Sequence, residues 1–225
     1  MGLRHALRLV AWTLGCIALP LALRDALGKP WGSIGVAIVA TLTGWILLYL
    51  PRTAHAAFDA TRFPLAYRRY RTLRALAFTR RRERAAHMSC VACRLAAGRV
   101  ADAEAMLARV DPAQLDPAER VVWLNNRATA ALDAGRDPAD ALALVEEATA
   151  LRPDVPSVQH TRARALLAVG RTDDAITVLD AMRTGGELSP YLESERCRDL
   201  AAAWEKKGQD DYAADYRRRA RLLVG

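Results

Sequence analysis

Hydrophobic residues form two nearly continuous stretches within the first fifty positions, whereas the rest of the chain alternates apolar and polar positions with a helical period. Residues 31–51 contain no charged side chain, and as a helix they would span roughly 30 Å, the thickness of a bilayer core. Trp31, Trp45 and Tyr49 lie toward the ends of this segment, where aromatic rings favour the membrane interface. The pattern predicts a transmembrane helix over residues 31–50.

A shorter apolar run, Leu9–Leu23, precedes this segment. As a helix it would reach only about 22 Å, so the flanking arginines would have to extend their side chains to the interface. A secretory signal peptide and a lipoprotein signal ending at Cys16 are the alternatives. The first lacks a clear small-residue cleavage site, and the second has too short an apolar region. We therefore predict a transmembrane hairpin over residues 1–51, with spans at about 7–24 and 31–50.

The distribution of basic residues predicts the orientation of this hairpin. The loop between the two spans carries two basic residues, whereas residues 52–84 carry ten arginines against two acids. Basic residues accumulate on the cytoplasmic side of membrane spans. We therefore expect both the N-terminus and everything after Pro51 to lie in the cytoplasm.

An arginine-rich segment follows the second span. Across residues 63–86, small and apolar positions recur at intervals of three and four while arginines occupy other faces, which predicts a basic amphipathic helix. We expect residues 52–84 to form a juxtamembrane collar on the anionic lipid head groups. A topology determinant without a ligand and a nucleic-acid site are the alternatives. The expected membrane-surface residues are Arg68, Arg69, Arg71, Arg74, Arg80, Arg81 and Arg82.

Four stretches of the remaining chain resemble one another, each with a glycine followed five or six residues later by an alanine. The alanines are Ala103, Ala141, Ala175 and Ala213, with spacings of 38, 34 and 38 residues. A glycine permits the left-handed conformation that ends a helix, and an alanine permits two helices to cross closely. The repeat predicts pairs of amphipathic helices that stack to bury a shared core.

This region resembles the tetratricopeptide repeat, or TPR, whose period is 34 residues. The unit over residues 121–154 fits best, with Ala128 on its first helix and Ala141 and Val145 on its second. The resemblance implies an all-α fold, in which a right-handed α-solenoid of about four helix pairs over residues 85–225 follows the hairpin. In layout the chain is similar to bacterial inner-membrane TPR proteins, including the type associated with haem biosynthesis and others that serve envelope assembly.

The charge distribution and the missing motifs narrow the functional class. The net charge is +8 at pH 7, but residues 85–225 carry 19 basic and 22 acidic residues. A nucleic-acid-binding module would carry its basic face on the folded domain, so no nucleic-acid partner is expected. The sequence contains no Walker-type glycine loop, no GxSxG and no HExxH. We therefore expect a binding protein that is not an enzyme and needs no cofactor.

The stretch HMSCVAC over residues 87–93 contains the one pattern that suggests metal or thiol chemistry. His87, Cys90 and Cys93 supply only three local ligands, whereas a structural zinc site needs four. A redox CxxC motif expects a βαβ setting, which the helical pattern does not provide. We expect these side chains to pack on the first helix of the first repeat, with no metal. A metal- or redox-active membrane protein is the alternative.

The resemblance to TPR also implies where a partner would bind. The first helix of each pair lines the concave side of such a solenoid, and here the corresponding positions are polar. Asparagine bonds peptide backbone and arginine pairs with carboxylates, so we expect an extended segment of a protein partner. Simple solvation of these side chains is the alternative. The expected groove residues are Asn125, Asn126, Thr129, His160, Thr161, Arg164 and Arg198, with Asp199 beside them.

A chaperone C-terminus is not the expected partner, because Met88 and Ala92 occupy two positions of the lysine-rich clamp that such TPR proteins use. The combined expectation is a scaffold anchored in the bacterial inner membrane, with its repeats in the cytoplasm. It would recruit protein partners there for envelope or membrane-complex biogenesis. The sequence leaves the oligomeric state open.

Overall fold

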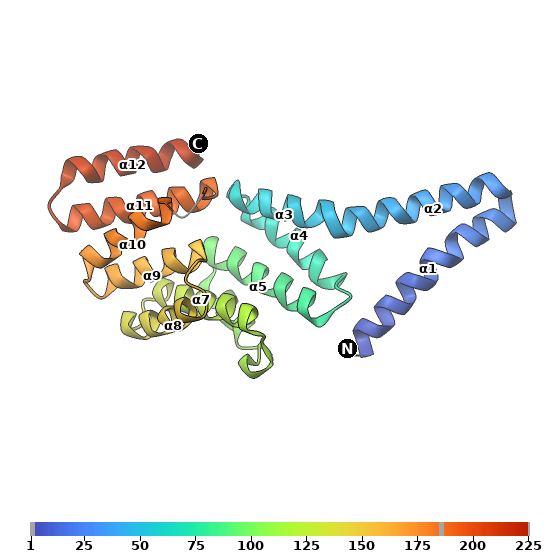
Figure 1. Cartoon of the computed structure of the whole chain (residues 1–225), viewed down its shortest axis with the longest axis horizontal. Helices are drawn as coiled ribbons and strands as arrows, with labels where there is room; N and C mark the ends of the chain where they lie inside the picture. The colour runs from blue at the N-terminus through green and yellow to red at the C-terminus, as the bar shows by residue number, and fades with distance from the viewer. Residues whose placement is uncertain (1–2, 185–186, 225) are drawn as a thin grey trace. The chain divides into compact units, whose positions relative to one another are not determined.

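A computed structural model of the chain describes residues 3–184 and 187–224 (Figure 1). Every regular element in these two ranges is helical, which confirms the predicted all-α class. The chain divides into two compact units. The first contains Met1–Ala56 and Leu65–Cys90, and the second contains Ala57–Pro64 and Val91–Gly225.

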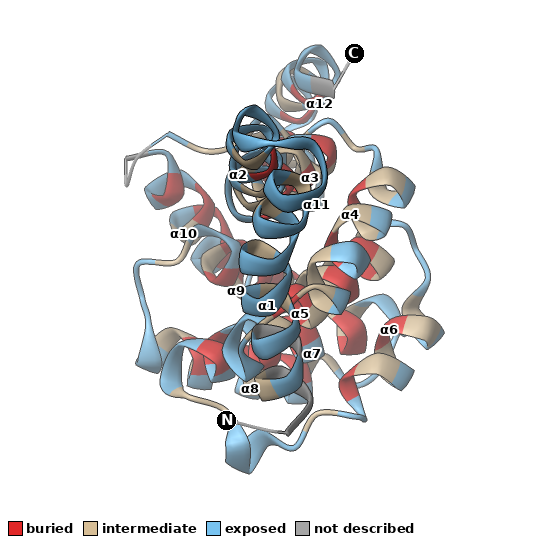
Figure 2. Cartoon of the chain, turned by 90° about the vertical axis from the view of Figure 1, so that its right-hand side faces the viewer, coloured by how far each residue is buried: buried red, intermediate tan, exposed pale blue. Residues whose placement is uncertain are grey.

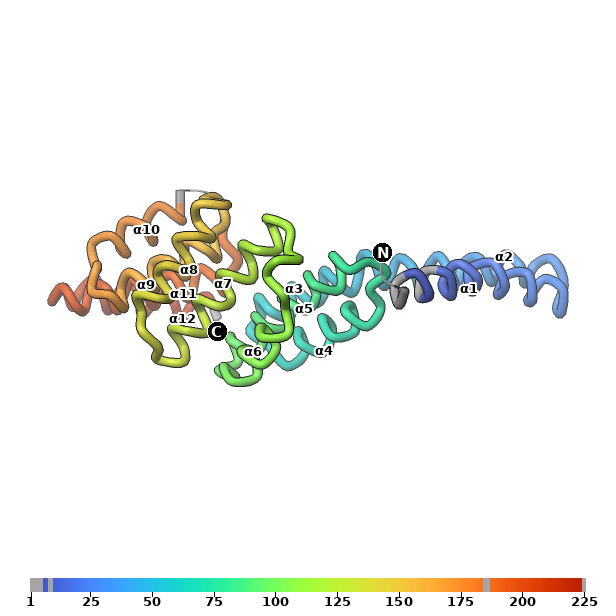
Figure 3. Tube along the Cα trace, turned by 90° about the horizontal axis from the view of Figure 1, so that it is seen from below, coloured from blue at the N-terminus to red at the C-terminus, as the bar shows by residue number. Residues whose placement is uncertain are grey.

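In the first unit, helices α1 (Leu3–Leu27) and α2 (Lys29–Gly44) form an antiparallel pair (Figures 1 and 3). The two helices approach closely at Gly35, where an added Cβ would lie 2.7 Å from the Cα of Pro20 and 3.1 Å from the side chain of Leu23. Any larger residue at position 35 would therefore push the two helices apart.

Figure 2 shows that much of this pair is exposed, and many of its exposed side chains are large and apolar. Val10–Leu27 and Lys29–Asp59 are both long and apolar enough to cross a membrane. By length and composition, two such helices near the N-terminus are compatible with a membrane anchor or a signal sequence.

The second apolar helix does not end at Pro51 as expected. It passes through a π-helical turn, η1 (Trp45–Tyr49), and continues as α3 (Leu50–Asp59). The N–H of Leu50 reaches back five residues to the carbonyl of Trp45. Proline lacks the N–H that would extend the normal ladder, and a local widening of the helix accommodates it.

The arginine-rich segment forms two helices, so the prediction of one amphipathic helix was wrong. Helix α4 (Phe63–Ala75) ends before an irregular turn at residues 76–79, and α5 (Arg80–Ala96) begins after it. The hydroxyl of Thr79 accepts a hydrogen bond from the N–H of Arg82 at 3.2 Å. A threonine in this role starts a new helix, because it satisfies an N–H that has no partner within the helix.

The helices after residue 80 follow one another in pairs, as predicted (Figures 1 and 3). The pairs are α5 with α6 (Val100–Leu107), α7 (Pro117–Asp133) with α8 (Pro138–Leu151), α9 (Pro156–Ala168) with α10 (Thr172–Thr184), and α11 (Pro190–Lys206) with α12 (Asp210–Val224). A short 3₁₀ turn, η2 (Pro112–Gln114), lies between the first two pairs.

Each pair turns at one of the four glycines that the repeat predicted. Gly98, Gly135, Gly170 and Gly208 have φ angles from +67° to +83°, in the left-handed region. At each turn the same two backbone hydrogen bonds close the helix end. At the second turn, for example, Gly135 N donates to Leu132 O and the next N–H reaches back five residues. The predicted turn chemistry is confirmed.

The alanines that defined the repeat lie at the centre of the core. Ala103, Ala141, Ala175 and Ala213 are fully buried, and large residues such as Leu179 pack around them. Figure 2 shows the buried positions on helix faces that meet within and between pairs. Small side chains at these positions allow the second helix to approach the first, and the larger neighbours then fill the remaining space.

The turn between α3 and α4 has the same local geometry, with threonine in place of glycine. Thr61 has a φ of +57°, which is unusual for a β-branched residue. Its N–H donates to Phe58 O at 2.9 Å, and Arg62 N donates to Ala57 O at 2.8 Å. These are the two bonds that close each glycine turn, so the collar contains a helix pair closed in the same way as the four that follow.

The side-chain pattern around Thr61 also matches the repeat. Ala66 and Tyr70 stand five and nine residues after it, at the spacing of Ala103 and Leu107 after their turn glycine, and both are buried. The repeat-like pattern therefore begins one helix pair earlier than the four similar stretches of the sequence indicated.

Candidate partner-binding groove

A groove with a volume of about 850 Å³ lies in the second unit. Helices α7, α9 and α11 line it, together with the end of α5 and the turn between α3 and α4. Among the described residues, α8, α10 and α12 contribute none of its lining. The structure brings all the predicted groove residues to this one surface: Asn125, Asn126, Thr129, His160, Thr161, Arg164, Arg198 and Asp199.

Two contacts join α7 to α9 on the groove wall. The hydroxyl oxygens of Thr129 and Thr161 lie 3.3 Å apart. One turn further along each helix, Arg164 Nη2 donates to Asp133 Oδ1 at 2.6 Å. Both contacts run between the first helices of consecutive repeats, so the polar row also holds the two helices together.

A third contact joins α9 to α11. His160 Nε2 and Asp199 Oδ2 lie 2.8 Å apart, and His160 is buried. On the same face of α11, Arg198 pairs with Glu195. The first helices of three consecutive repeats are thus linked by side chains that line the groove.

The groove contains charged side chains of both signs, with one more carboxylate than arginine. Two arginines, Arg164 and Arg198, stand beside three carboxylates, Asp133, Glu195 and Asp199. Burial lowers the pKa of Arg164, but the hydrogen bond and the charge of Asp133 more than offset this and leave the pKa raised. A site that selects strongly acidic or strongly basic ligands would carry many charges of one sign. The groove does not have such an excess among its lining residues.

Asn125 lines the groove and has an unsatisfied side-chain acceptor. Its Oδ1 is buried, and no described residue donates a hydrogen bond to it. A buried acceptor without a partner is costly, and a donor supplied by a ligand would remove that cost. The N–H groups of an extended peptide are donors of this kind.

Aromatic rings form one part of the groove lining. Phe58 and Phe63, which flank the turn at Thr61, contact each other edge-on with ring centroids 5.4 Å apart. Both also contact Tyr191 at the start of α11, at 5.2 and 5.6 Å. Burial, and then the charge of Glu195, raise the pKa of Tyr191 to about 12. This cluster supplies part of the apolar lining of the groove, and Leu95 and Leu192 contribute to the rest.

Sequence reasoning missed several lining residues. Glu195 and Ser157 each stand 13 residues before a turn glycine, so the repeat register could have identified them. Asp133 could have been found in the same way, because it lies on the groove-facing helix two residues before Gly135. Tyr191 contacts residues far away in the sequence, and no local sequence pattern predicts these contacts.

Comparison with known families agrees with this geometry. Residues 131–184 match the family model of the tetratricopeptide repeat. Residues 131–184 are tetratricopeptide-repeat sequence. The matched segment contains α8, α9 and α10 and two of the turn glycines. Among curated proteins, none matches the chain. A TPR array supports a role in protein–protein interaction.

The collar arginines that precede the TPR match have two kinds of environment. Arg69 Nη1 donates to Thr53 O at 2.6 Å, and Arg74 Nη1 lies 2.9 Å from His87 Nδ1, so both hold helices of the first unit together. The guanidinium groups of these two residues are therefore partly committed to packing. The other predicted membrane-surface residues are exposed: Arg68, Arg71, Arg80, Arg81 and Arg82.

The cysteines of the HMSCVAC stretch lie on α5, the first helix of the first TPR-like pair. Cys90 and Cys93 are buried, with exposed fractions of 2% and 1%. His87 lies against the Arg74 guanidinium, a cation that would oppose a metal ion at the same nitrogen. In the described part of the chain, no group of three metal-ligating side chains is assembled. These placements favour the packing interpretation.

Proposed function

We propose that the protein is a membrane-anchored TPR scaffold that recruits protein partners. Helices α1 and α2 are the proposed anchor. Their exposed apolar surface supports this, because it would be unfavourable in water and matches a bilayer in length. The proposed hairpin spans about residues 7–24 and 31–50, which fall within these helices and the π-helical turn that follows.

The proposed binding site is the TPR groove. The observation that carries this proposal is that polar side chains from three consecutive first helices line one groove. A partner segment in extended conformation would place its backbone N–H groups near Asn125 and its apolar side chains near the aromatic cluster. Because the groove is preformed, such binding needs no cofactor and no catalytic step. We propose accordingly that the protein is not an enzyme.

The groove would face the cytoplasm. The ten arginines of residues 52–84 support this orientation, since basic residues stay on the cytoplasmic side of a span. We propose the bacterial inner membrane as the location and the assembly of envelope or membrane complexes as the process. The basis of these two finer proposals is the similarity in layout to bacterial inner-membrane TPR proteins.

A reporter fused to the C-terminus tests the anchor and its orientation. The proposal expects a reporter that is active in the cytoplasm and a protein that stays with the membrane under alkaline extraction. Activity only outside the cytoplasm would contradict the proposed hairpin. Release by alkali would show that neither apolar helix is an anchor.

A further inference from the structure

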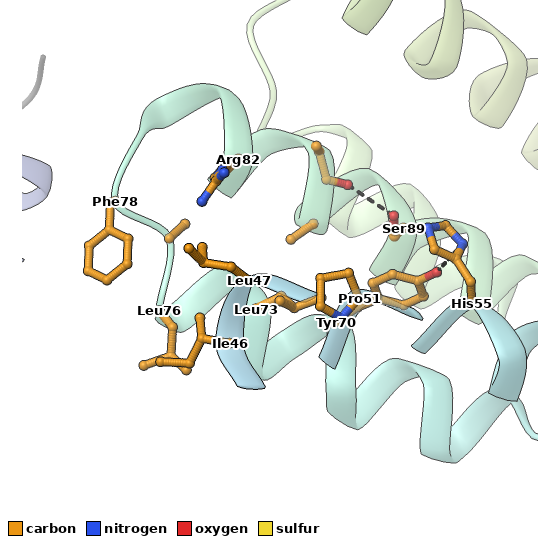
Figure 4. Close-up of a pocket in the computed structure, with 13 residues that line it drawn as sticks. Ile46, Leu47, Pro51, His55, Tyr70, Leu73, Leu76, Phe78, Arg82 and Ser89 are labelled. Atoms are coloured by element: carbon orange, nitrogen blue, oxygen red, sulfur yellow. Dashed lines mark hydrogen bonds between the residues drawn. The ribbon is translucent and has the colours of Figure 1, made fainter. Parts of the chain in front are cut away.

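The first unit contains an apolar cavity of about 260 Å³, shown in Figure 4. It lies between the π-helical turn η1, helix α3, helix α4 and the start of α5. Ile46 and Leu47 come from the π-helical turn, Leu73 and Leu76 from α4 and the turn after it, and Phe78 from the same turn. The interior is therefore suited to an aliphatic group.

The polar groups in the cavity wall are paired with one another. Tyr70 and His55 are joined by a hydrogen bond of 2.9 Å, and the Ser89 hydroxyl donates to Ala85 O at 3.1 Å (Figure 4). A ligand inside the cavity thus meets few unsatisfied donors or acceptors. This arrangement favours a hydrocarbon chain over a polar molecule, which would lose its hydrogen bonds to water without replacement.

Arg82 supplies the one permanent charge among the residues that line the cavity. Its side chain is exposed, and none of the lining residues is acidic. No ion pair of Arg82 with a carboxylate occurs among the described residues. In Figure 4 it lies across the cavity from Ile46 and Leu76. The site thus combines an apolar interior with a free guanidinium at its edge, and a guanidinium binds phosphate well.

The cavity lies beside the end of the apolar helix that begins at Lys29. The π-helical turn that supplies Ile46 and Leu47 interrupts this helix near the end of its proposed membrane span. Turns of this kind are rare and occur frequently at functional sites. Here two large apolar residues of the turn, Ile46 and Leu47, line the cavity.

We propose that this cavity binds one acyl chain of an anionic phospholipid, with the lipid phosphate on Arg82. The proposal rests on the membrane anchor of the proposed function. It differs from a general attraction between the collar and anionic lipids, because it requires one cavity and one arginine. The bound lipid would be retained with the protein, whereas lipids held only by surface charge exchange freely.

The test uses the full chain purified in mild detergent and supplied with phosphatidylglycerol or with phosphatidylcholine of identical acyl chains. Retained lipid is counted by native mass spectrometry. We expect about one phosphatidylglycerol per chain and little phosphatidylcholine. Arg82→Gln should reduce phosphatidylglycerol retention about tenfold, the effect of one charge-assisted hydrogen bond. Arg80→Gln is the matched control, since Arg80 is an exposed arginine of the same helix outside the cavity.

A second variant tests the acyl-chain part of the site. Ala85 lines the cavity from an exposed position, so Ala85→Trp should fill the cavity without disturbing the core and should abolish retention. Its fold is checked by helicity and thermal unfolding. Inorganic phosphate alone should not compete with the lipid at comparable concentration.

Three outcomes would overturn the proposal: equal losses in Arg82→Gln and Arg80→Gln, unchanged retention in folded Ala85→Trp, or equal retention of both lipids. Competition by inorganic phosphate would also overturn it, by showing that the cavity takes no part. Loss of the membrane anchor itself would appear as release by alkali, an independent measurement. The two failures can therefore be told apart.

Discussion

Arg164 and Asp133 connect the first helices of two consecutive TPRs through a hydrogen bond of 2.6 Å, and both line the groove. Both side chains are less than a third exposed. The contact therefore has two roles: it holds α7 and α9 in register, and it positions the guanidinium on the proposed binding surface. The contribution of this contact to stability can be measured without knowing the partner.

Arg164→Ala should lower the free energy of unfolding by about 1–3 kcal/mol, because it leaves the Asp133 carboxylate without its charged partner. Arg162→Ala is the matched control, since Arg162 lies two residues away on the same helix and pairs with Glu146 outside the groove. That more exposed pair should contribute no more than about 1 kcal/mol. Urea unfolding followed by circular dichroism measures both values. Equal losses would contradict the structural role of the Arg164 pair.

Substitution by glycine should favour the left-handed turn at Thr61, whereas replacing a turn glycine should destabilise its turn. Its left-handed backbone carries a steric cost of roughly 1–2 kcal/mol for a residue with a Cβ. Thr61→Gly should therefore be more stable than Thr61→Ala, which keeps the Cβ, by about 1 kcal/mol. Gly170→Ala should be less stable than the parent for the same reason. Thermal unfolding of the three variants tests this, and a Thr61→Ala variant at least as stable as Thr61→Gly would refute it.

Tyr191 should make stability depend on alkaline pH. Its pKa is raised from 10.0 to about 12 in the folded protein, mainly by burial. Between these values the unfolded chain loses the phenolic proton first, so the free energy of unfolding should fall as the pH rises through this window. Tyr191→Phe keeps the aromatic contacts and should show a smaller fall. Tyrosinate absorbance of the two proteins checks the assignment. An absorbance difference that develops at pH 10 instead would contradict it.

Arg196 should be among the most sensitive positions of α11. It is only 2% exposed, and its guanidinium donates two hydrogen bonds to Glu193, at 2.7 and 2.6 Å, and one to Leu179 O. Removing one partner of such a pair typically costs about 3–5 kcal/mol, so Arg196→Ala should unfold far more readily than the parent. Arg198→Ala, on the exposed face of the same helix, should change stability by less than about 1 kcal/mol. Chemical unfolding measures both free energies of unfolding. Similar losses of stability in Arg196→Ala and Arg198→Ala would contradict the role assigned to Arg196.

Much of the TPR region could be predicted from sequence because the repeat is local. A glycine at each turn and an alanine five or six residues later determine where one helix ends and how closely the next one packs. The polar groove residues could be predicted for the same reason, because they stand at fixed numbers of residues before the turn glycine. Asn125 and His160 each stand ten residues before a turn glycine.

The collar was harder to predict because its signals compete. The predicted helix over residues 63–86 joined α4 and α5, because the arginine-rich pattern continues through the turn at residues 76–79. Thr61 replaces the glycine that marks every other turn, so the pair of α3 and α4 was not recognised. The aromatic cluster depends on long-range packing. Phe58 and Tyr191 are 133 residues apart in the sequence, and only the folded chain brings their rings within 5.2 Å.

The central claim is that the TPR groove binds a partner while the chain is in the membrane. Photo-crosslinking in native membranes tests it most directly, with a photoreactive residue at Thr129 in the groove or at Thr149 on α8, outside it. Our account predicts a discrete protein adduct at position 129 and none at position 149. The adduct should disappear with Asn125→Ala and Arg164→Ala together and should persist with Arg162→Ala. Equal adducts at both positions, or an adduct at position 129 that survives the groove substitutions, would contradict the account.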